Sequence, residues 1–332
     1  MTKMTEFTFL STDGRTQLHG MLWEPEAVPV RAVLQVCHGV AEHIARYDGF
    51  ARALNEQGIV VAGHDHLGHG KSLPEGGTPV YFGDGNTWNT VVDDIYVLHQ
   101  RLKQRYPDVP LCIMGHSMGS FLTRTYLIRY PGTVKAAVIM GTGWQPRAAI
   151  TGGLALANAI AAVSGENATS ELVTELAFGS YNKLFAPNRT KVDWLSADES
   201  NVDDYIADPL CGADATVGLF RQMLHGIRFN QRQSHLRQMD REMPVLFVAG
   251  DKDPVGSCGK GVRQTYDAFR AAGMRDCTLK LYPGLRHEIL NEKAYAADIT
   301  KDIEAWLLSR LEKYARSRRD KGETTMTEWE AL

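Results

Sequence analysis

The sequence predicts an α/β fold in which a mostly parallel, doubly wound sheet carries one helical insertion. Apolar runs without alternation, such as residues 31–37 and 244–250, are typical of strands covered on both faces. Segments with helical spacing lie between these runs, and strands that alternate with helices form parallel units. The alternation stops between residues 144 and 240, where only helical segments are found. One sheet with one insertion accounts for all three observations.

The first half of the chain supplies most of the expected elements. Residues 5–10 and 17–24 alternate apolar and polar side chains, which predicts two strands joined by a turn at Asp13-Gly14. The other predicted strands are residues 31–37, 59–63, 111–114 and 134–140, and the predicted helices are residues 46–57, 88–105 and 117–129.

The second half returns to the same alternation after the insertion. Strands are predicted at residues 244–250 and 277–282, and helices at residues 259–272 and 292–314. We expect residues 1–143 and 241–314 to form an α/β core and residues 144–240 to form a helical cap over the carboxyl ends of the strands. Residues 315–332 are charged and polar and are predicted to be a frayed C-terminal tail.

Composition excludes several classes of protein. The net charge is −3, so there is no basic footprint for a nucleic-acid partner. The five cysteines are scattered and contain no CxxC pair, which argues against a disulfide framework and favours a reducing, cytoplasmic location. No signal peptide is recognisable, and no run approaches the ~20 apolar residues that span a membrane.

Residues 115–119 read Gly-His-Ser-Met-Gly and lie where a predicted strand meets a predicted helix. A G-x-S-x-G sequence in that context is typical of a serine nucleophile on a sharp turn. The free N–H groups at the start of the helix would stabilise a developing oxyanion. The alternative is a tight turn with an incidental serine. We expect Ser117 to be a nucleophile.

A serine nucleophile needs a base, and the base needs an orienting acid. His287 follows the last predicted strand, at the sheet edge where the functional sites of α/β folds lie. Asp251 and Asp253 follow the strand at residues 244–250. We favour Asp253, because Asp251 suits a turn in which its side chain bonds to its own backbone. The chain order serine, aspartate, histidine is that of the α/β-hydrolase triad.

The loop after the strand at residues 31–37 is expected to complete an oxyanion hole. It reads His38-Gly-Val-Ala-Glu-His43, and Gly39 would let the backbone approach a substrate. The N–H groups of Val40 and Met118 are the expected donors. The alternative is that His38-Gly39 is only a turn that ends a strand.

Residues 64–69 read His-Asp-His-Leu-Gly-His and resemble a cluster of metal ligands. Clusters of this kind in a single sequence are weak evidence, and the surrounding glycines indicate a sharp loop after a strand. We predict no metal site and no cofactor.

Together, the segments HGVAEH, DHLGHGKS, GHSMGS and GDKDP with the late histidine resemble the monoacylglycerol lipase and lysophospholipase group of α/β-hydrolases, also called the serine aminopeptidase S33 group. The resemblance covers about residues 15–310. It implies a triad of Ser117, Asp253 and His287, an oxyanion hole at Val40 and Met118, and no cofactor. It also implies that Glu42 and His43 help to hold the oxyanion loop, and His38, Gly39 and His116 are further expected supporting residues. Where monoacylglycerol lipases carry a cysteine after the catalytic aspartate, this chain has Gly256, with Cys258 further on.

The expected activity is hydrolysis of small acyl esters of the monoacylglycerol or lysophospholipid type through an acyl-enzyme. Trp144, directly after a strand, is expected to line the substrate pocket, although ordinary packing explains it equally well. The apolar stretch 154–163 is either a core-facing cap helix or else an acyl-chain wall or a lid that contacts a membrane surface transiently. The sequence specifies neither the acyl chain length and head group nor the oligomeric state.

Two other functions remain open at this stage. A peptidase or amidase of the same fold would need carboxylates to hold a substrate ammonium, and Glu166, Glu171 and Glu175 in the cap could supply them. A non-catalytic ligand-binding protein could keep the same scaffold, but the intact triad argues against it. A haloalkane dehalogenase is excluded because it needs an aspartate where this chain has Ser117.

Overall fold

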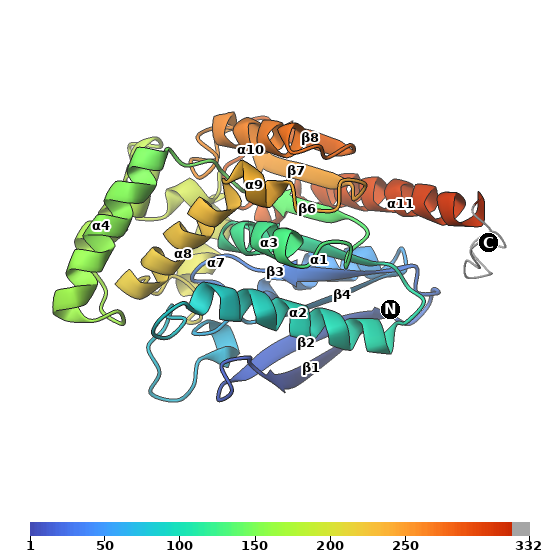
Figure 1. The fold of residues 1–332 in the computed structure, drawn as a ribbon, viewed down its shortest axis with the longest axis horizontal. Coiled ribbons are helices and arrows are strands. Elements are labelled where there is room, and N and C mark those ends of the chain that lie inside the picture. The colour runs from blue at the N-terminus through green and yellow to red at the C-terminus, as the bar shows by residue number, and fades with distance from the viewer. Residues whose placement is uncertain (321–332) are drawn as a thin grey trace.

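The computed structural model describes residues 1–320 of the chain, and within them all side chains except those of 176, 177 and 317–320. A central eight-stranded sheet is covered by helices on both faces (Figure 1). Its strands are β1 Thr2–Leu10, β2 Gln17–Pro25, β3 Ala32–Cys37, β4 Ile59–His64, β5 Leu111–His116, β6 Ala137–Met140, β7 Val245–Gly250 and β8 Cys277–Tyr282.

The strand order is β1-β2-β4-β3-β5-β6-β7-β8. The β1–β2 and β2–β4 pairs are antiparallel, and every pair from β4 to β8 is parallel. Strands β3, β4, β5 and β7 are buried along their whole length, as their continuous apolar sequences predict. The predicted mostly parallel, doubly wound sheet is therefore confirmed.

The helices that cover the sheet fall into two groups. The described core helices are α1 Asp48–Asn55, α2 Thr87–Arg105, α3 Met118–Arg129, α10 Lys260–Ala271 and α11 Ala296–Asp320, with short turns η1 Ile44–Tyr47, η2 Gly70–Ser72 and η5 Ile289–Asn291. Leu54 of α1 and Ile303 of α11 belong to the apolar cluster on one face of the sheet. Ile95 of α2, Leu122 of α3 and Phe269 of α10 belong to the cluster on the other face.

The segment between β6 and β7 is helical, as predicted. Its described elements are α4 Arg147–Ser164, α5 Glu171–Thr174, η3 Glu175–Gly179, α6 Ser180–Lys183, η4 Asp193–Leu195, α7 Glu199–Ala207, α8 Val217–Asn230 and α9 Gln233–Leu236. Figure 1 shows α4, α7 and α8 gathered at one end of the sheet. The division into core and cap at residues 144 and 240 stays a prediction.

Several ends of elements differ from the sequence prediction. Strand β6 begins at Ala137 rather than at residue 134, and α11 begins at Ala296 and continues to Asp320. Six residues assigned to the frayed tail, 315–320, are therefore helical. The rest of the predicted tail, residues 321–332, lies outside the described residues. Residues 315–320 contain neither proline nor glycine, so nothing in them ends a helix.

Helix α4 is longer than the contiguous apolar run at residues 154–163 suggested. Small residues extend it to 18 residues, and its buried side chains are Ile150, Leu154 and Ala157. Val163, by contrast, is 89% exposed. By length and composition alone, α4 is the one described helix that could cross a membrane. It nevertheless packs against α8 within the insertion.

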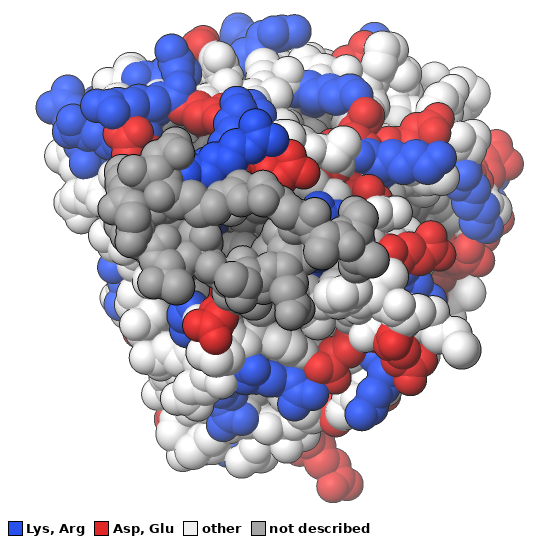
Figure 2. Space-filling model, turned by 90° about the vertical axis from the view of Figure 1, so that its right-hand side faces the viewer, with Lys and Arg blue, Asp and Glu red and all other residues white. Residues whose placement is uncertain are grey.

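Charge is mixed on the face of the molecule shown in Figure 2. Lysine and arginine side chains lie among aspartate and glutamate side chains there, as expected for a net charge of −3. Neither sign dominates that face.

Candidate active site

Ser117 occupies the turn between β5 and α3. Its backbone has φ 54° and ψ −122°, a left-handed conformation that a serine adopts only when the surrounding structure enforces it. The Ser117 N–H donates to the carbonyl oxygen of Met140 on β6 at 3.0 Å, which holds the turn against the neighbouring strand. The side chain is nearly covered, since the residue is 8% exposed.

The two glycines that flank Ser117 are required by contacts across the turn. A Cβ at Gly115 would lie 2.2 Å from the carbonyl oxygen of Gly119. A Cβ at Gly119 would lie 2.1 Å from the carbonyl oxygen of Cys37 at the end of β3. Both clashes are with backbone atoms, which cannot rotate away. The G-x-S-x-G sequence is therefore a steric condition for this bend.

Asp253 and His287 meet beside this turn. Asp253 Oδ1 and His287 Nδ1 are 3.0 Å apart, and both side chains are buried. Asp253 Oδ1 also accepts the Val255 N–H at 2.9 Å, which fixes the carboxylate. Asp251 instead accepts the N–H of Gly284 at 2.8 Å in an exposed loop. The geometry thus pairs Asp253, and not Asp251, with the imidazole.

The Nε2 atom of the His287 ring is buried and has no hydrogen-bond partner among the described residues, Ser117 Oγ included. A Cβ at Gly141, at the end of β6, would lie 3.0 Å from His287 Cε1, so this glycine makes room for the ring. Trp194 of η4 packs on the same ring at a centroid distance of 5.1 Å. The insertion therefore reaches the imidazole directly.

The loop after β3 lies against Ser117. A Cβ at Gly39 would come within 3.1 Å of Ser117 Cβ, so only a glycine permits this approach without displacement. The next N–H along the chain, that of Val40, has no hydrogen-bond partner among residues 1–320, and neither has the N–H of Met118 at the start of α3. Two free N–H donors therefore flank the serine from different segments.

Glu42 holds this loop in place. Its carboxylate accepts the Gly39 N–H at 2.5 Å, His116 Nδ1 at 3.1 Å, the Tyr47 hydroxyl at 3.1 Å and Arg46 at 3.0 Å. Burial opposes ionisation of Glu42, but the bond from His116 and the charge of Arg46 outweigh it and hold its pKa well below the usual range. Burial likewise opposes charge on His116, but the bond to Glu42 raises the pKa of His116 overall.

The other histidines of the loop have separate contacts. His38 Nδ1 donates to the carbonyl oxygen of Gly39 at 2.8 Å, and its Nε2 accepts the His66 N–H at 3.0 Å. Burial lowers the pKa of His38, which keeps the ring neutral. His43 Nε2 lies 2.8 Å from Asp208 Oδ2 at the end of α7. The loop is thereby tied both to the core and to the insertion.

The histidines of the segment 64–69 pack together but do not gather as metal ligands. The His38 and His66 rings lie 4.2 Å apart between centroids, and the His64 and His66 rings 5.1 Å apart. Among the described residues, the one group of three candidate ligand atoms within 4.8 Å of one another is His43, Asp208 and Cys211. The cluster in the sequence is thus a packed set of rings.

Three residues of the site were missed by the sequence analysis. Trp194 contacts the His287 ring. Trp144, the residue predicted to line the substrate pocket, is half-buried and makes no ring contact among the described residues, so that role stays a prediction. Arg46 and Glu288 form a buried ion pair beside Glu42. Only the position of Glu288 directly after His287 could have pointed to it.

Comparison with known proteins identifies relatives over most of the chain. The family model described as serine aminopeptidase, S33, matches residues 28–294. A monoacylglycerol lipase of Mycolicibacterium smegmatis is 32% identical over 295 residues, which cover 87% of this chain and 92% of that protein. The human monoglyceride lipase is 28% identical, covering 87% and 86% of the two chains. The crystal structure of a thermostable carboxyl esterase from Bacillus coagulans superposes with a TM-score of 0.86 at 26% identity, covering 93% and 99%.

The fold, the turn at Ser117 and these relatives together define an α/β-hydrolase of the lipase and esterase type. Within that class, the chain belongs to the serine aminopeptidase S33 family.

Proposed function

We propose that the chain hydrolyses carboxylic esters of acyl chains, with Ser117 as nucleophile, His287 as general base and Asp253 as the orienting acid. The observation that carries the proposal is the buried 3.0 Å contact between Asp253 Oδ1 and His287 Nδ1, which leaves His287 Nε2 unpaired beside the Ser117 turn. An imidazole held in this way is the standard partner of a serine nucleophile.

The proposed reaction has two halves. Ser117 Oγ attacks the ester carbonyl carbon while its proton moves to His287 Nε2, and the negative oxygen is held by the N–H groups of Val40 and Met118. The bond to the alcohol then breaks, and the alcohol leaves with the proton from His287. Water attacks the acyl-enzyme with His287 as base, and this step releases the carboxylic acid and restores the Ser117 hydroxyl. Asp253 stabilises the imidazolium in both halves.

Monoacylglycerols and lysophospholipids are the proposed substrates. The relatives named monoacylglycerol or monoglyceride lipases support an acylglycerol, and the apolar helix α4 supports a long acyl chain. A side chain at Gly256 would meet Val262 Cγ2 at 2.6 Å, so the cysteine that the resemblance places there would need Val262 to move. Turnover of monoacylglycerols and lysophosphatidylcholines of increasing chain length tests the substrate class.

Ser117→Ala tests the chemistry directly with a p-nitrophenyl ester. We expect activity to fall close to background, and retention of wild-type activity would exclude Ser117 as nucleophile. A fluorophosphonate probe should label the wild type and not Ser117→Ala. A chain that merely binds ligands on this scaffold would leave the probe unreacted.

A second candidate, hydrolysis of amides or N-terminal peptide bonds, is favoured only by the family's description as an aminopeptidase. Two of the carboxylates that could hold a substrate ammonium are engaged, since Glu166 pairs with Arg221 and Glu175 pairs with Lys183. Comparison of a monoacylglycerol with an aminoacyl anilide under the same conditions separates the two activities.

Transient contact of the cap with a membrane surface is part of the proposal. Helix α4 is mostly exposed, and Leu172, which follows it in the insertion, is 55% exposed. Vesicle sedimentation of the wild type and Val163→Asp tests this contact, and equal sedimentation of the two would argue against it. All five cysteines are free, which supports a reducing, cytoplasmic location.

A further inference from the structure

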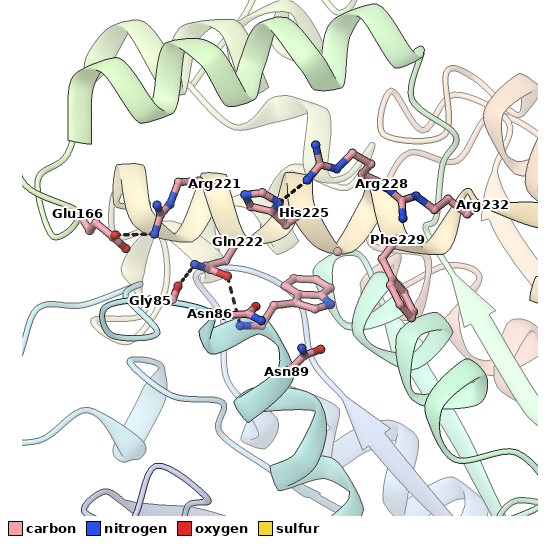
Figure 3. A pocket seen from close by; sticks show the side chains of 12 residues that line it. Gly85, Asn86, Asn89, Glu166, Arg221, Gln222, His225, Arg228, Phe229 and Arg232 are labelled. Atoms are coloured by element: carbon pink, nitrogen blue, oxygen red, sulfur yellow. Dashed lines mark hydrogen bonds and ion pairs between the residues drawn. The ribbon is translucent and has the colours of Figure 1, made fainter. Parts of the chain in front are cut away.

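A cavity of about 500 Å³ lies between helix α8 and the start of α2 (Figure 3). The residues that line it include Asn86 and Asn89 at the start of α2 and Arg221, His225, Arg228 and Arg232 on or just after α8. None of the residues described around Ser117 lines it. The cavity is therefore separate from the candidate active site.

One wall of this cavity is basic. Arg221, His225 and Arg228 are spaced by four and three residues along α8, which puts them on one side of the helix. Arg232 follows just after the end of α8. Figure 3 shows these four side chains in a row along one side of the helix. Among the described residues, Glu166 is the only carboxylate that lines the cavity.

The charges of this wall are only partly neutralised. Glu166 pairs with Arg221. Neither Arg228 nor Arg232 has a carboxylate within ion-pair distance among the described residues, and Arg228 contacts His225 Nδ1 at 2.9 Å. Burial, together with the charges of Arg228 and Arg221, lowers the pKa of His225, so this ring acts as a neutral acceptor. Three guanidinium groups against one carboxylate leave two positive charges unmatched.

The opposite wall adds polar donors from the start of α2. Asn86 and Asn89 line the cavity there, and Gln222 bridges the walls by bonding to the carbonyl oxygen of Gly85 and accepting the Trp88 N–H at 3.4 Å. The N-terminus of this 19-residue helix also directs the positive end of its dipole to the same side. An anion in the cavity would thus meet cations on one wall and amide donors on the other.

We propose that this cavity binds a phosphate group. Arginine suits phosphate because its planar fork donates two parallel hydrogen bonds to adjacent oxygens. Arg228 and Arg232 supply two such forks with no competing carboxylate. The phosphate can belong to a small soluble compound or to a phospholipid head group. The exposed helix α4, which packs against α8, places a lipid source within reach.

In the first test, the melting temperature is measured at increasing concentrations of inorganic phosphate and, at matched ionic strength, of chloride. We expect phosphate, and not chloride, to raise the melting temperature of the wild type. In the double variant Arg228→Gln/Arg232→Gln the apparent affinity should fall at least about 10-fold. The matched control is Arg237→Gln, an exposed arginine outside the cavity, which should respond like the wild type. Equal phosphate responses in the wild type and the double variant would overturn the proposal.

The second test separates the two sources of phosphate. Sedimentation is measured with vesicles of phosphatidylcholine alone and of phosphatidylcholine mixed with phosphatidic acid. The cavity is assigned to a lipid head group if the wild type binds the mixed vesicles more strongly than the phosphatidylcholine vesicles. This difference should then be lost in the double variant, kept in Arg237→Gln and removed by inorganic phosphate. Phosphate binding without that vesicle difference assigns it to a soluble compound. Hydrolysis of p-nitrophenyl butyrate should be unchanged in the double variant, which shows that the variant is folded.

Discussion

Arg46 and Glu288 form a bidentate ion pair inside the protein, with Arg46 Nη1 2.7 Å from Glu288 Oε1 and Arg46 Nη2 2.8 Å from Glu288 Oε2. Their side chains are 11% and 3% exposed. The pair joins three segments, because Arg46 also bonds to Glu42 beneath Gly39 and Glu288 accepts a bond from Asn201 of α7 at 3.0 Å. The chain on either side of Ser117 is thus connected through one buried network of charges.

Removal of one partner of this ion pair should lower the free energy of unfolding substantially. Glu288→Gln would leave Arg46 with a single carboxylate in a buried environment, and removal of one partner of such a pair typically costs about 3–5 kcal/mol. Urea unfolding measures the change. The control is Arg52→Gln, which breaks an exposed pair with Asp48 and should leave stability unchanged within error. Equal effects of the two variants would contradict a structural role for the buried pair.

The two aspartates after β7 should differ sharply in their effect on catalysis. Asp253→Asn would remove the charge that faces His287 and should lower kcat by about 10⁴-fold, the scale seen when a triad aspartate becomes an amide. Asp251→Asn would weaken only a loop contact to Gly284 and should change kcat by less than about threefold. Steady-state kinetics with one ester substrate compare the kcat values of the two variants. A large loss in Asp251→Asn would reverse the assignment.

Local sequence rules predicted the parts of the site that depend on backbone geometry. The turn at Ser117 follows from glycines at positions 115 and 119, because any side chain there meets backbone atoms. The loops that carry Asp253 and His287 follow strands, so their meeting at one sheet edge could be expected from topology. These constraints act between residues that are close in the sequence or through the order of the strands. Both kinds of constraint can be inferred from a single sequence.

Contacts that depend on the path of the insertion were not predictable in the same way. Trp194 reaches the His287 ring only because a chain of short helices and turns returns it to the core. The Arg46–Glu288 pair joins residues 242 positions apart. Nothing in the local pattern of either residue specifies its partner. Helix ends were missed for the simpler reason that propensity places them only to within a few residues.

Two glycine-to-alanine substitutions should have opposite effects on stability. Gly119→Ala places a Cβ 2.1 Å from the Cys37 carbonyl oxygen and should cost about 1–3 kcal/mol or more, because the strand end must move. Gly152→Ala adds a methyl group on α4 with nothing within 4 Å. It should stabilise the protein by about 0.5–1 kcal/mol through helix propensity. Chemical denaturation of both variants measures the difference, and a neutral Gly119→Ala would refute the steric account of the turn.

Acid should destabilise the protein through its buried histidines. Burial lowers the pKa of both His64 and His69 to about 3. In the unfolded chain these rings titrate near the usual value of about 6.5, so below that pH the unfolded state binds protons that the folded state excludes. Stability is therefore lost as the pH falls from about 6.5 towards 3, at roughly 1.4 kcal/mol per pH unit for each ring.

His64→Leu isolates the contribution of one of these rings. Both ring nitrogens of His64 lack hydrogen-bond partners in the described residues, so an apolar replacement of similar size loses no bond there. We expect unfolding free energies of the wild type and the variant to differ little at pH 7. Between pH 6 and 4 the wild type should lose up to about 1.4 kcal/mol per unit more than the variant, because only the wild type must keep this ring unprotonated. Urea titrations at four pH values measure both slopes, and parallel curves would show that His64 is protonated as readily in the folded protein as in the unfolded chain.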